Sequence, residues 1–470
     1  AGSATPGKIA LAVLGPSRAE RWSYARLTAA VRGTATGLLS TGLVPGDRVL
    51  LRLGNTPDFP VAFLGALAAG LVPVPTSAQL TGPEIGVIAD ALAPAALIAA
   101  DGIALPDHPA PVLTDKALRQ MHDLPPADWH MGDPERPGYI VFTSGTSGQP
   151  RGVVHAHRAI WARRMMWQGW YGLTPEDRLL HAGAFNWTYT LGTGLLDPWA
   201  VGATALIPAP GTEPQALPLL MKRHDATLFA AAPGVYRQML KGSVPSLPKL
   251  RHGLSAGEKL PETTRQAWLA ATGTPIHEAY GMSECSTFIS GSPARPAPPG
   301  TLGFPQPGRQ VRLIEGGIAV HRSDPGLMLG YLDAPEATEA RFDGEWFRTG
   351  DMARLTEDGA VIYEGRADDM LNAGGVRVSP LEIEAAMLTH PGVAEAAACE
   401  LRVKADTSVI GLFYAGEATD SRGLQDHAAE RLARYKQPRL YVHLPSLPRS
   451  ANGKLQRRAL RSDWEETHGQ

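Results

Sequence analysis

Apolar and polar positions along the chain change period repeatedly, which predicts helices alternating with strands. The first hundred residues predict a helix, a strand, a helix and a strand, in that order, over Ser23–Gly42, Val49–Leu53, Phe63–Ala69 and Leu71–Val74. In the first of these, Leu27, Val31 and Leu38 recur near helical spacing, and a glycine ends the run. Because the alternation continues, we expect an α/β fold in which mostly parallel sheets are flanked by helices.

The pattern changes near Gly365. The stretch before it, Val311–Glu364, reads as short strands and turns. The stretch after it predicts one helix and two strands, over Pro380–His390, Val393–Leu401 and Val409–Tyr414. We therefore expect a large, multi-layered N-terminal domain over residues 1–367 and a small α+β C-terminal domain over residues 368–470, with the boundary within Gly365–Asp369.

The helix predicted at Pro380 carries a start signal of its own. Ser379 is a residue type that caps helices, and proline suits the first helical position. Glu382 stands where a glutamate reaches back to the cap, so we expect a capping box here.

Composition narrows the class of protein. A chain of 470 residues with 44% hydrophobic and 19% charged residues is ordinary for a globular protein of two or three domains. A net charge of -2 gives no reason to expect a nucleic-acid partner or binding to an anionic membrane. Two cysteines, Cys285 and Cys399, cannot make a disulfide framework and have no metal-ligand spacing around them. With no signal-peptide pattern at the start, we expect a cytoplasmic protein; the oligomeric state stays open.

The first chemistry-bearing segment follows the strand predicted over Tyr139–Phe142. It reads Thr143-Ser144-Gly145-Thr146-Ser147-Gly148, with Arg151 close behind. Glycines let backbone N–H groups converge on an anion, hydroxyls add donors, and the arginine would complete a polyphosphate site. No Gly-Lys-Ser/Thr follows, so this is not a Walker A loop. By itself the segment is equally compatible with a flexible surface turn.

Four further segments are ambiguous one at a time. They are His277–Glu284, which includes Tyr280, Ser283 and Glu284; Thr349-Gly350-Asp351; Gly365–Asp369 followed by Asn372–Arg377; and Pro448–Lys454. An aromatic ring can stack on a purine, a carboxylate can hold Mg²⁺ or ribose hydroxyls, and a glycine pair between arginines suits a pivoting hairpin near phosphates. Each segment taken alone is more simply a solvated turn or an exposed terminus.

Together, the five segments resemble in order and separation the core motifs of the adenylate-forming superfamily. That superfamily contains acyl-CoA synthetases, peptide-synthetase adenylation domains and firefly luciferases. FTSGTSGQPRG resembles its phosphate loop, SAGEKLP (Ser255–Pro261) and AYGMSE its adenine and metal segments, and TGD, GRADD and SANGK complete the set. The resemblance runs from about Trp22 to Leu460. One departure is Arg151, where the superfamily usually has lysine, which keeps the charge but changes its geometry.

The resemblance implies two half-reactions, with ATP, Mg²⁺ and coenzyme A as cofactors and co-substrates. A carboxylate first attacks the α-phosphate of ATP, and a thiol then attacks the resulting acyl-AMP. The resemblance assigns phosphate binding to the loop residues from Thr143 to Gly148 with Arg151, and Mg²⁺ to Glu284 and Thr146. It assigns the adenine to Gly257, Glu258, Tyr280, Gly281 and Ser283, the ribose to Asp351 and Arg366, and the catalytic positions to Lys454, Arg377 and Glu284.

The resemblance also implies that the small C-terminal domain is mobile. Lys454 would bridge the carboxylate and the α-phosphate in the first state, and Arg377 would contact phosphate in one of the two states. Asp368 matches the hinge, and Gly374 with Gly375 matches the passage for the pantetheine arm. Such rotation assembles two active sites in turn.

The acid is suggested by the segment that matches the acyl pocket, Phe185, Asn186 and Trp187 with Gly281 and Met282. Amino-acid-activating relatives usually carry aspartate where Asn186 stands, and acetate-specific ones carry tryptophan where Gly281 stands. Resemblance to benzoate-type and medium-chain ligases therefore favours an aromatic or medium-length acid. The aromatic residues here also fit simple core packing.

Two other functions stay open from the sequence. A free-standing enzyme that loads an acyl group onto a carrier protein would use the same adenylation residues. A non-catalytic nucleotide-binding relative would not need Lys454, Glu284, Asp351 and Arg366 together, and all four are present.

Overall fold

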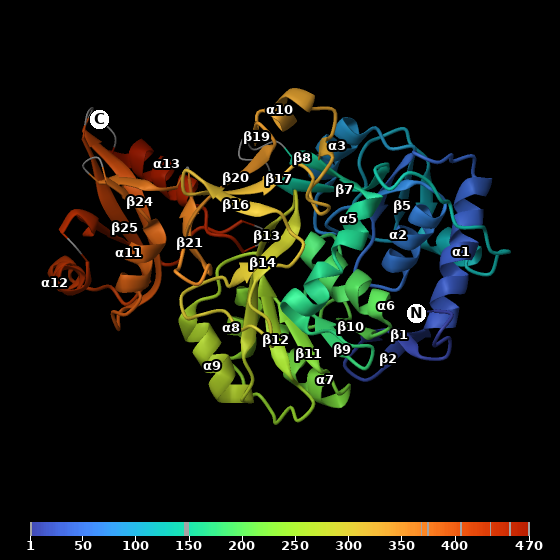
Figure 1. The fold of residues 1–470 in the computed structure, drawn as a ribbon, viewed down its shortest axis with the longest axis horizontal. Coiled ribbons are helices and arrows are strands. Elements are labelled where there is room, and N and C mark those ends of the chain that lie inside the picture. Colours follow the sequence, from blue (N-terminus) through green and yellow to red (C-terminus); the bar gives the residue numbers. More distant parts are fainter. Residues whose placement is uncertain are drawn as a thin grey trace. The chain divides into compact units, whose positions relative to one another are not determined.

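The computed structural model describes residues 2–144, 150–367, 369–373, 376–404, 407–432, 434–450 and 453–468, with backbone alone at residues 144, 372, 373, 376, 377, 404, 407 and 435. Contacts divide the chain into two units (Figure 1). The first contains Ala1–Gln310 and His321–Glu345, and the second contains Val311–Val320 and Trp346–Gln470. A boundary between residues 367 and 368 stays a prediction, and Asp368 lies outside the described residues.

The largest sheet of the first unit has nine strands (Figure 1). In spatial order they are β15 (Phe304–Pro305), β14 (Ser286–Ser290), β13 (Ile276–Met282), β12 (His252–Ala256), β11 (Leu228–Ala231), β9 (Arg178–His181), β10 (Thr204–Pro208), β1 (Ile9–Leu14) and β2 (Ala19–Ser23). Strands β13 to β1 in this order run parallel, while β2, β14 and β15 are antiparallel to their neighbours. This confirms the prediction of a mostly parallel sheet, and its inner strands β10, β11 and β12 are buried along their whole length because both faces are covered.

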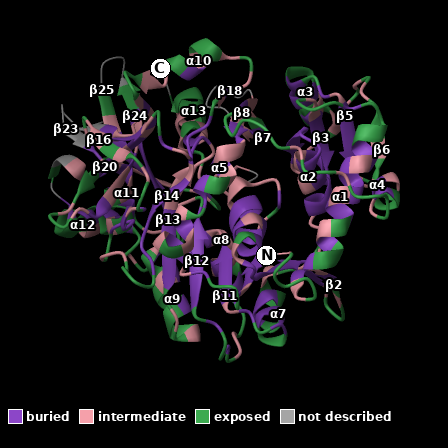
Figure 2. Ribbon diagram, turned by 45° about the vertical axis from the view of Figure 1, so that its right-hand side comes forward, coloured by how far each residue is buried: buried purple, intermediate pink, exposed green. Residues whose placement is uncertain are grey.

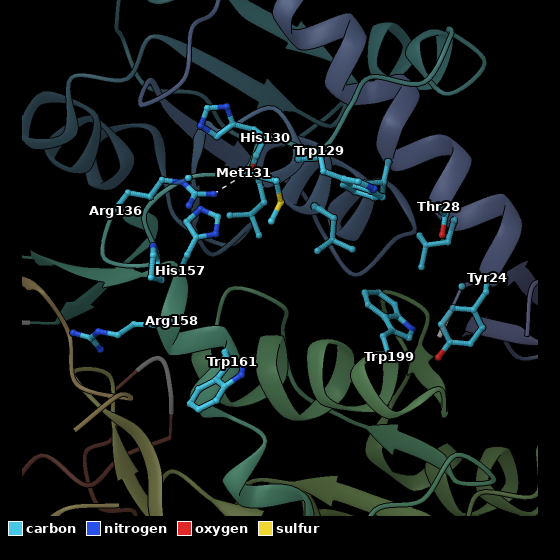
Figure 3. A pocket seen from close by; sticks show the side chains of 18 residues that line it. Tyr24, Thr28, Trp129, His130, Met131, Arg136, His157, Arg158, Trp161 and Trp199 are labelled. Atoms are coloured by element: carbon cyan, nitrogen blue, oxygen red, sulfur yellow. Dashed lines mark hydrogen bonds between the residues drawn. The ribbon is translucent and has the colours of Figure 1, made fainter. Parts of the chain in front are cut away.

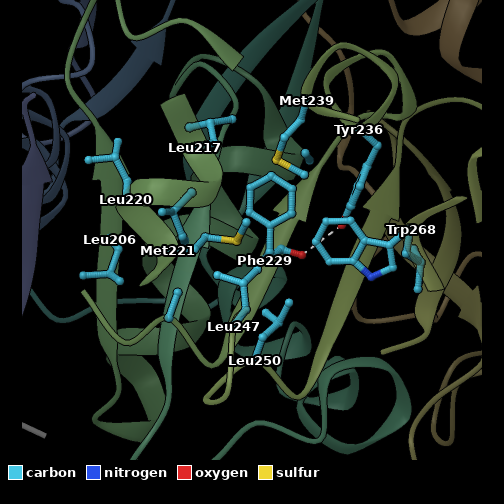
Figure 4. Packing of buried hydrophobic residues seen from close by; sticks show 14 of the residues in the cluster. Leu206, Leu217, Leu220, Met221, Phe229, Tyr236, Met239, Leu247, Leu250 and Trp268 are labelled. Atoms are coloured by element: carbon cyan, nitrogen blue, oxygen red, sulfur yellow. Dashed lines mark hydrogen bonds between the residues drawn. The ribbon is translucent and has the colours of Figure 1, made fainter. Parts of the chain in front are cut away.

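Helices α7 (Leu217–Arg223), α8 (Pro233–Met239) and α9 (Glu262–Thr272) cover one face of this sheet. Figure 4 shows the packing on that face around Phe229. The Phe229 ring stacks on Trp268 at 5.7 Å between centroids and meets Tyr236 edge-on at 5.1 Å. The buried Tyr236 hydroxyl accepts from the Leu254 N–H at 3.1 Å, so the polar end of this side chain is satisfied. On the other face, helical segments η1 (Trp167–Tyr171) and η2 (Thr190–Leu196) bury Trp170 and Tyr171.

A second sheet of the first unit is fully parallel, with strands β4 (Val72–Pro75), β3 (Arg48–Arg52), β5 (Ala96–Ala99) and β6 (Val112–Thr114). Helices α1 (Tyr24–Ser40), α2 (Asp58–Ala68), α3 (Gly82–Leu92) and α4 (Asp115–Met121) accompany it. The predicted helix at residue 23 is confirmed, and the Ser23 hydroxyl caps it by accepting from the Arg26 N–H at 3.2 Å. Helix α2 begins at Asp58, five residues earlier than predicted, because Pro60 falls in its first turn, where proline is tolerated.

A third, antiparallel sheet of the first unit contains β18 (Gly330–Tyr331), β8 (Pro150–Ala156) and β7 (Pro137–Ser144). Ile140 of β7 is buried and packs in one cluster with Ile85 of α3 and Leu97 of β5. Figure 2 shows the strands of the first unit as mostly buried and their connections as mostly exposed. The strand that leads into the predicted phosphate loop, β7, is therefore anchored in the core.

The second unit contributes β16 (Val311–Ile314), β17 (Gly317–His321), β20 (Trp346–Leu355) and β21 (Val361–Arg366) to a five-stranded sheet, in which the pairs β16–β17 and β20–β21 are antiparallel. It also contains β24 (Val393–Lys404), β25 (Thr407–Gly416) and β26 (Leu440–His443), with helices α11 (Pro380–Met387), α12 (Ser421–Arg431) and α13 (Arg457–His468). Residues 311–320 group with this unit because β17 lies beside β20, and local patterns do not reveal a pairing between distant segments. Among the described residues, no helix is long and apolar enough to cross a membrane.

The capping box predicted at α11 is wrong. The Ser379 hydroxyl makes no capping bond and donates instead to the backbone carbonyl of Glu364 in β21. Glu382 pairs with Lys436 rather than reaching back to residue 379. A carbonyl of the neighbouring strand and a nearby ammonium group compete successfully for both side chains.

Candidate active site

The phosphate-loop segment is the tip of the β7–β8 hairpin. Phe142 lies opposite Gly152 and Thr143 opposite Arg151, so the two strands deliver these residues to the base of the tip together. Gly145, Thr146, Ser147 and Gly148 lie outside the described residues, as does the side chain of Ser144. A Cβ added at Gly152 would lie 3.0 Å from the Leu332 Cβ, so this glycine serves close packing beneath the tip.

Arg151, Tyr331 and Glu284 form a row of contacts beside the hairpin. The Arg151 guanidinium carbon lies 5.5 Å from the centroid of the Tyr331 ring. The Tyr331 hydroxyl donates to Glu284 Oε1 at 2.8 Å, and β18 holds Tyr331 against Val153 of β8. Burial, reinforced by the Glu284 carboxylate, raises the pKa of the Tyr331 phenol, so the hydroxyl keeps its proton. The Tyr331 side chain thus has a cation near its ring and a carboxylate at its hydroxyl.

The turn between β13 and β14, which carries Glu284, is fixed from the hairpin side as well. His155 of β8 is buried and places Nε2 2.8 Å from the carbonyl oxygen of Ser283. Burial lowers the pKa of His155 to about 4, so the neutral ring donates this bond at neutral pH. The Met328 N–H donates to the Glu284 carbonyl at 2.7 Å. The backbone on both sides of the Glu284 side chain is therefore bonded to neighbouring segments.

Gly281 is required by close packing in this turn. A Cβ at that position would lie 2.2 Å from the Ser286 carbonyl oxygen and 2.5 Å from the Thr287 Cα. The ladder between β13 and β14 shifts register here, between Tyr280 and Gly281. The strand approach is thus one physical reason for glycine, beside the pocket size predicted from the sequence.

The two adenine segments leave neighbouring strands of the large sheet. Ala256 ends β12 opposite Ala279 of β13, so Gly257 and Tyr280 follow at the same edge. Gly257 has a φ of +98°, which favours glycine, and Glu258 beside it is half-buried. The Tyr280 ring is half-buried and meets Phe288 edge-on at 5.2 Å. The carboxyl ends of parallel strands are where such sheets bind ligands.

The segment predicted to line the acyl pocket is held by a side chain from another sheet. Asn55, which follows β3, donates from Nδ2 to the Gly183 carbonyl at 2.8 Å and accepts at Oδ1 from the Phe185 N–H at 3.1 Å. Phe185 is only 1% exposed and packs on Phe59 at 5.0 Å. Asn186 and Trp187 are half-buried. Phe185 is therefore a core residue, while the side chains of Asn186 and Trp187 are partly accessible.

The second unit holds the residues predicted for the ribose. Asp351 of β20 lies opposite Arg366 of β21 and is 4% exposed. The Tyr363 hydroxyl donates to Asp351 Oδ1 at 2.9 Å, and Arg366 Nη1 donates to Oδ2 at 3.4 Å and to the Thr349 carbonyl at 3.1 Å. Burial and the Asp351 charge raise the pKa of the Tyr363 phenol. The two predicted residues are brought together, with a tyrosine as the third member.

The predicted catalytic lysine stands on a closed turn of the second unit. The Ser450 N–H donates to the Lys454 carbonyl at 2.8 Å, and the Lys454 N–H donates to the Ser450 hydroxyl at 3.2 Å. Gly453, with a φ of +81°, permits the turn, and Arg449 bonds its carbonyl at 2.8 Å. The Lys454 side chain is exposed. The backbone at Lys454 is thus bonded to Ser450, and the lysine side chain is exposed.

The residues predicted for the hinge and the pantetheine passage are grouped around one strand pair. Gly374 and Gly375 lie outside the described residues, as does Asp368, and the side chain of Arg377 is not described. Of the strand pair around them, β22 (Leu371–Ala373) and β23 (Val376–Val378) form an antiparallel ladder in which Asn372 faces Arg377. The predicted hairpin is therefore present as a ladder.

Sequence analysis missed four supporting side chains, which are Asn55, His155, Tyr331 and Tyr363. Each is far in sequence from its partner, and Asn55 lies 130 residues from Phe185. None stands in a motif, and the only signal is a polar residue directly after or within a buried strand. A buried ion pair was missed as well. Arg163 Nη2 lies 2.7 Å from Asp197 Oδ2, and Arg163 Nη1 donates to the Ser286 hydroxyl at 2.5 Å, two residues beyond Glu284.

Comparison with known proteins places these features in a family. The chain is 31% identical to 3-hydroxybenzoate–CoA ligase of Aromatoleum sp. (strain CIB), an alignment that covers 96% of this chain and 92% of the relative. It is 32% identical to benzoate–CoA ligase of Thauera aromatica, over 94% of this chain and 90% of the relative. A solved benzoate CoA ligase from Burkholderia xenovorans LB400 superposes with a TM-score of 0.86 at 28% identity, covering 98% of each chain.

The family model described as AMP-binding enzyme matches residues 1–332, and the model of its C-terminal domain matches residues 382–454. The first match includes the hairpin, Glu284 and Tyr331, and the second ends on Lys454. The chain belongs to the AMP-binding enzyme family.

Proposed function

We propose that the chain is an AMP-forming acid:CoA ligase that acts on an aromatic or medium-length carboxylic acid. In the first half-reaction, a carboxylate oxygen bonds to the α-phosphorus of ATP as the bond to the bridging oxygen breaks and pyrophosphate leaves. In the second, the thiolate of coenzyme A bonds to the acyl carbon and AMP leaves. The observation that carries this function is the row Arg151–Tyr331–Glu284 beside the hairpin tip, in a member of the AMP-binding enzyme family.

Charge neutralisation is the main demand of the first half-reaction, because a carboxylate approaches a polyanion. Arg151 and the loop residues from Thr143 to Gly148 would hold the β- and γ-phosphates. Lys454 would bridge the carboxylate and the α-phosphate, where charge accumulates in the transition state. The exposed lysine chain on a bonded turn supports this role.

The residues at Glu284 fit a magnesium ion. Oε1 accepts from Tyr331, while Oε2 accepts no hydrogen bond from the part of the chain that the structure describes. Carboxylate oxygen is a ligand type that Mg²⁺ prefers. Glu284, with Thr146 of the loop, would hold the ion, which neutralises charge on the β- and γ-phosphates when bound.

The nucleoside of ATP has candidate residues for its ribose and for its adenine. Asp351 with Arg366 suits two ribose hydroxyls, and Tyr363 adds a bond that fixes the carboxylate. Tyr280, Gly257, Glu258, Gly281 and Ser283 would surround the adenine. We propose that rotation about Asp368 moves Lys454 away for the second half-reaction and brings Gly374 and Gly375 to the acyl carbon, with Arg377 on a phosphate.

The choice of acid is supported by the relatives. Those at 31% and 32% identity are named ligases of 3-hydroxybenzoate and benzoate. The rat mitochondrial acyl-coenzyme A synthetase ACSM2 is 28% identical over the whole of this chain. Half-buried Asn186 and Trp187 would contact the acyl group, with Met282 and Gly281 beside them. ATP and coenzyme A are abundant in the cytoplasm, and we propose that location.

The direct test supplies ATP, Mg²⁺ and a panel of acids that includes benzoate, 3-hydroxybenzoate, octanoate, acetate and phenylalanine. Pyrophosphate exchange measures adenylation, and AMP release on adding coenzyme A measures the whole reaction. We expect exchange with the aromatic acids and octanoate, and AMP release with coenzyme A. AMP release that needs a carrier protein would favour a carrier-loading enzyme, and no exchange with any acid would contradict catalysis altogether.

A further inference from the structure

A groove of about 810 Å³ lies in the first unit, and none of the residues given a role above lines it. Its walls come from α1 with Tyr24 and Thr28, from the segment 129–136, and from α5 (His157–Ala162) (Figure 3). The volume is within the range of small-molecule sites in proteins. We call it the tryptophan groove after Trp129, Trp161 and Trp199, which are part of its lining.

The tryptophan groove exposes large apolar side chains. Trp129 is 50% exposed, Trp161 is 52% exposed and Met131 is 83% exposed. Two of these rings carry a cation on their faces, since Arg164 lies 3.4 Å from the Trp161 ring and Arg32 lies 5.5 Å from the Trp129 ring. Clustered exposed aromatic surface of this kind marks a binding site more often than a random surface does.

The groove is polarised along its length. Figure 3 shows Arg136, His157 and Arg158 at one end, and Trp129, Trp199, Tyr24 and Thr28 toward the other. No aspartate or glutamate is among the described residues that line it. Arg158 is already paired with Glu135 at 2.7 Å. Arg136 makes no ion pair with the described residues, so its positive charge is available to a ligand.

Two nitrogens at the charged end are buried and have no partner among the described residues, Arg136 Nε and His157 Nε2. The other guanidinium nitrogens of Arg136 are occupied, since Nη1 donates to the Asp133 carbonyl at 2.8 Å and Nη2 to the His130 carbonyl at 3.2 Å. Burial, with Arg136 and His130 nearby, lowers the pKa of His157 to about 4, so its ring is neutral at physiological pH. A buried donor without a partner destabilises the fold, and an anionic group that accepts from it would relieve this cost.

We propose that the tryptophan groove binds a second molecule of an amphipathic monocarboxylate, separate from the acyl site. Its carboxylate lies against Arg136 Nε and His157, and its apolar body lies among Trp129, Trp161 and Trp199. Arg136 at the charged end of the groove can neutralise the single negative charge of a carboxylate. An aromatic acid and a fatty acid share this chemistry, and the measurement separates them.

The test is equilibrium dialysis of the full chain against labelled octanoate or labelled benzoate, without ATP. The acid that occupies the groove shows two saturable classes of site per chain. Leu64→Trp fills space in the groove and Arg136→Gln removes the positive charge. Each variant weakens the same one of the two classes at least tenfold. Pyrophosphate exchange by both variants stays within twofold of the wild type, because neither residue belongs to the proposed ATP or acyl sites. Labelled 1-octanol, which lacks the charge, binds that class at least tenfold more weakly than octanoate.

The outcomes are separate from those of the proposed function. If both acids show a single class of site on the wild-type chain, the groove is not a binding site. The same conclusion follows if the second class survives in a variant whose circular dichroism matches that of the wild type. Equal binding of 1-octanol overturns the role of the charge. Loss of exchange activity with every acid would contradict the ligase and leave the dialysis result standing.

Discussion

Glu284 and Asp351, the two carboxylates of the proposed ATP site, each accept a hydrogen bond from a tyrosine, at 2.8 and 2.9 Å. A hydrogen bond to the charged form stabilises a carboxylate and fixes its direction. The sequence predicted both carboxylates through their motifs, but it could not predict Tyr331 or Tyr363. These lie 47 and 12 residues from their partners, and only the folded strands bring them together.

Tyr331→Phe tests this support. The variant keeps the ring beside Arg151 and removes only the bond to Glu284 Oε1. One such bond to a charged group contributes about 1.5 kcal/mol, so we expect the KM for MgATP to rise roughly five- to fifteenfold in pyrophosphate exchange. Tyr441→Phe is the matched control, because the Tyr441 hydroxyl is buried without a partner among the described residues. An unchanged KM in Tyr331→Phe would show that Glu284 needs no support.

Lys454→Ala separates the two half-reactions. Removing one charge-stabilising donor from a transition state typically costs 10²–10³ in rate, so pyrophosphate exchange should fall by about that factor. Formation of the thioester from supplied acyl-AMP and coenzyme A should stay within about threefold. Lys249→Ala, at another exposed lysine, should change neither rate. Equal loss of both half-reactions would contradict the role proposed for Lys454.

At the scale of elements, the alternation of apolar runs predicted strands and helices well where the signal is local. The helix at Ser23 and the strands over β3, β4, β24 and β25 are confirmed. The capping box at Ser379 failed because β21, which is not adjacent in sequence, competes for the serine hydroxyl. Element type follows from local periodicity, whereas side-chain partners at element ends depend on what the fold places nearby.

Gly192 in η2 shows the same dependence and gives an element-scale prediction. A Cβ there would lie 1.9 Å from the Arg163 guanidinium carbon, and Arg163 cannot move away because Asp197 holds it in the core. Separating a buried ion pair costs about 3–5 kcal/mol, so Gly192→Ala should lower the free energy of unfolding by at least about 2 kcal/mol. Urea unfolding measures this.

Gly234→Ala is the control for that experiment. Gly234 lies in α8, and an added Cβ would meet only the Arg237 side chain at 3.9 Å. Because the added methyl group has room there and alanine suits a helix, this variant should be at least as stable as the wild type. Similar loss of stability in both variants would show that the contact with Arg163 is not the cause.

At the scale of the whole molecule, long-range pairing decides what the sequence leaves open. Residues 311–320 belong with the second unit because β17 lies beside β20, across more than twenty intervening residues. The sequence predicted two domains and their chemistry through motifs, since those are local. It could not assign a short strand to a distant sheet. Apolar alternation indicates which face of a strand is buried, but it does not indicate which other strand pairs with it.

Buried histidines of the first unit make its stability depend on pH. Burial lowers the pKa of His155 to about 4 and that of His181 to about 3, below an unfolded value near 6.5. Both pKa values are depressed, so the stability is complete above about pH 6.5 and is lost as pH falls toward the folded values. At pH 5 each of these two rings would reduce the free energy of unfolding by about 2 kcal/mol.

Urea unfolding at pH 7.5, 6 and 5 checks this expectation. His155→Gln should lower stability at pH 7.5 and should also reduce the loss between pH 7.5 and 5 by about 2 kcal/mol, because one titrating ring is absent. A loss of packing lowers the free energy of unfolding equally at every pH, whereas titration changes its slope with pH. Comparing the slopes of the variant and the wild type therefore separates the two effects. A wild-type stability that is flat from pH 7.5 to 5 would contradict the buried, neutral state of these rings.

Asn55 has a consequence for how the substrate range of such an enzyme can change. Because its amide bonds the backbone at Gly183 and Phe185, the course of the chain before Asn186 and Trp187 is set from a different sheet. The two Asn55 bonds do not involve the side chains at 186 and 187, which are half-buried. We therefore expect mutation at these two positions of the proposed acyl site to change the accepted acid with little loss of stability, so this segment is a natural place for selection or design to begin.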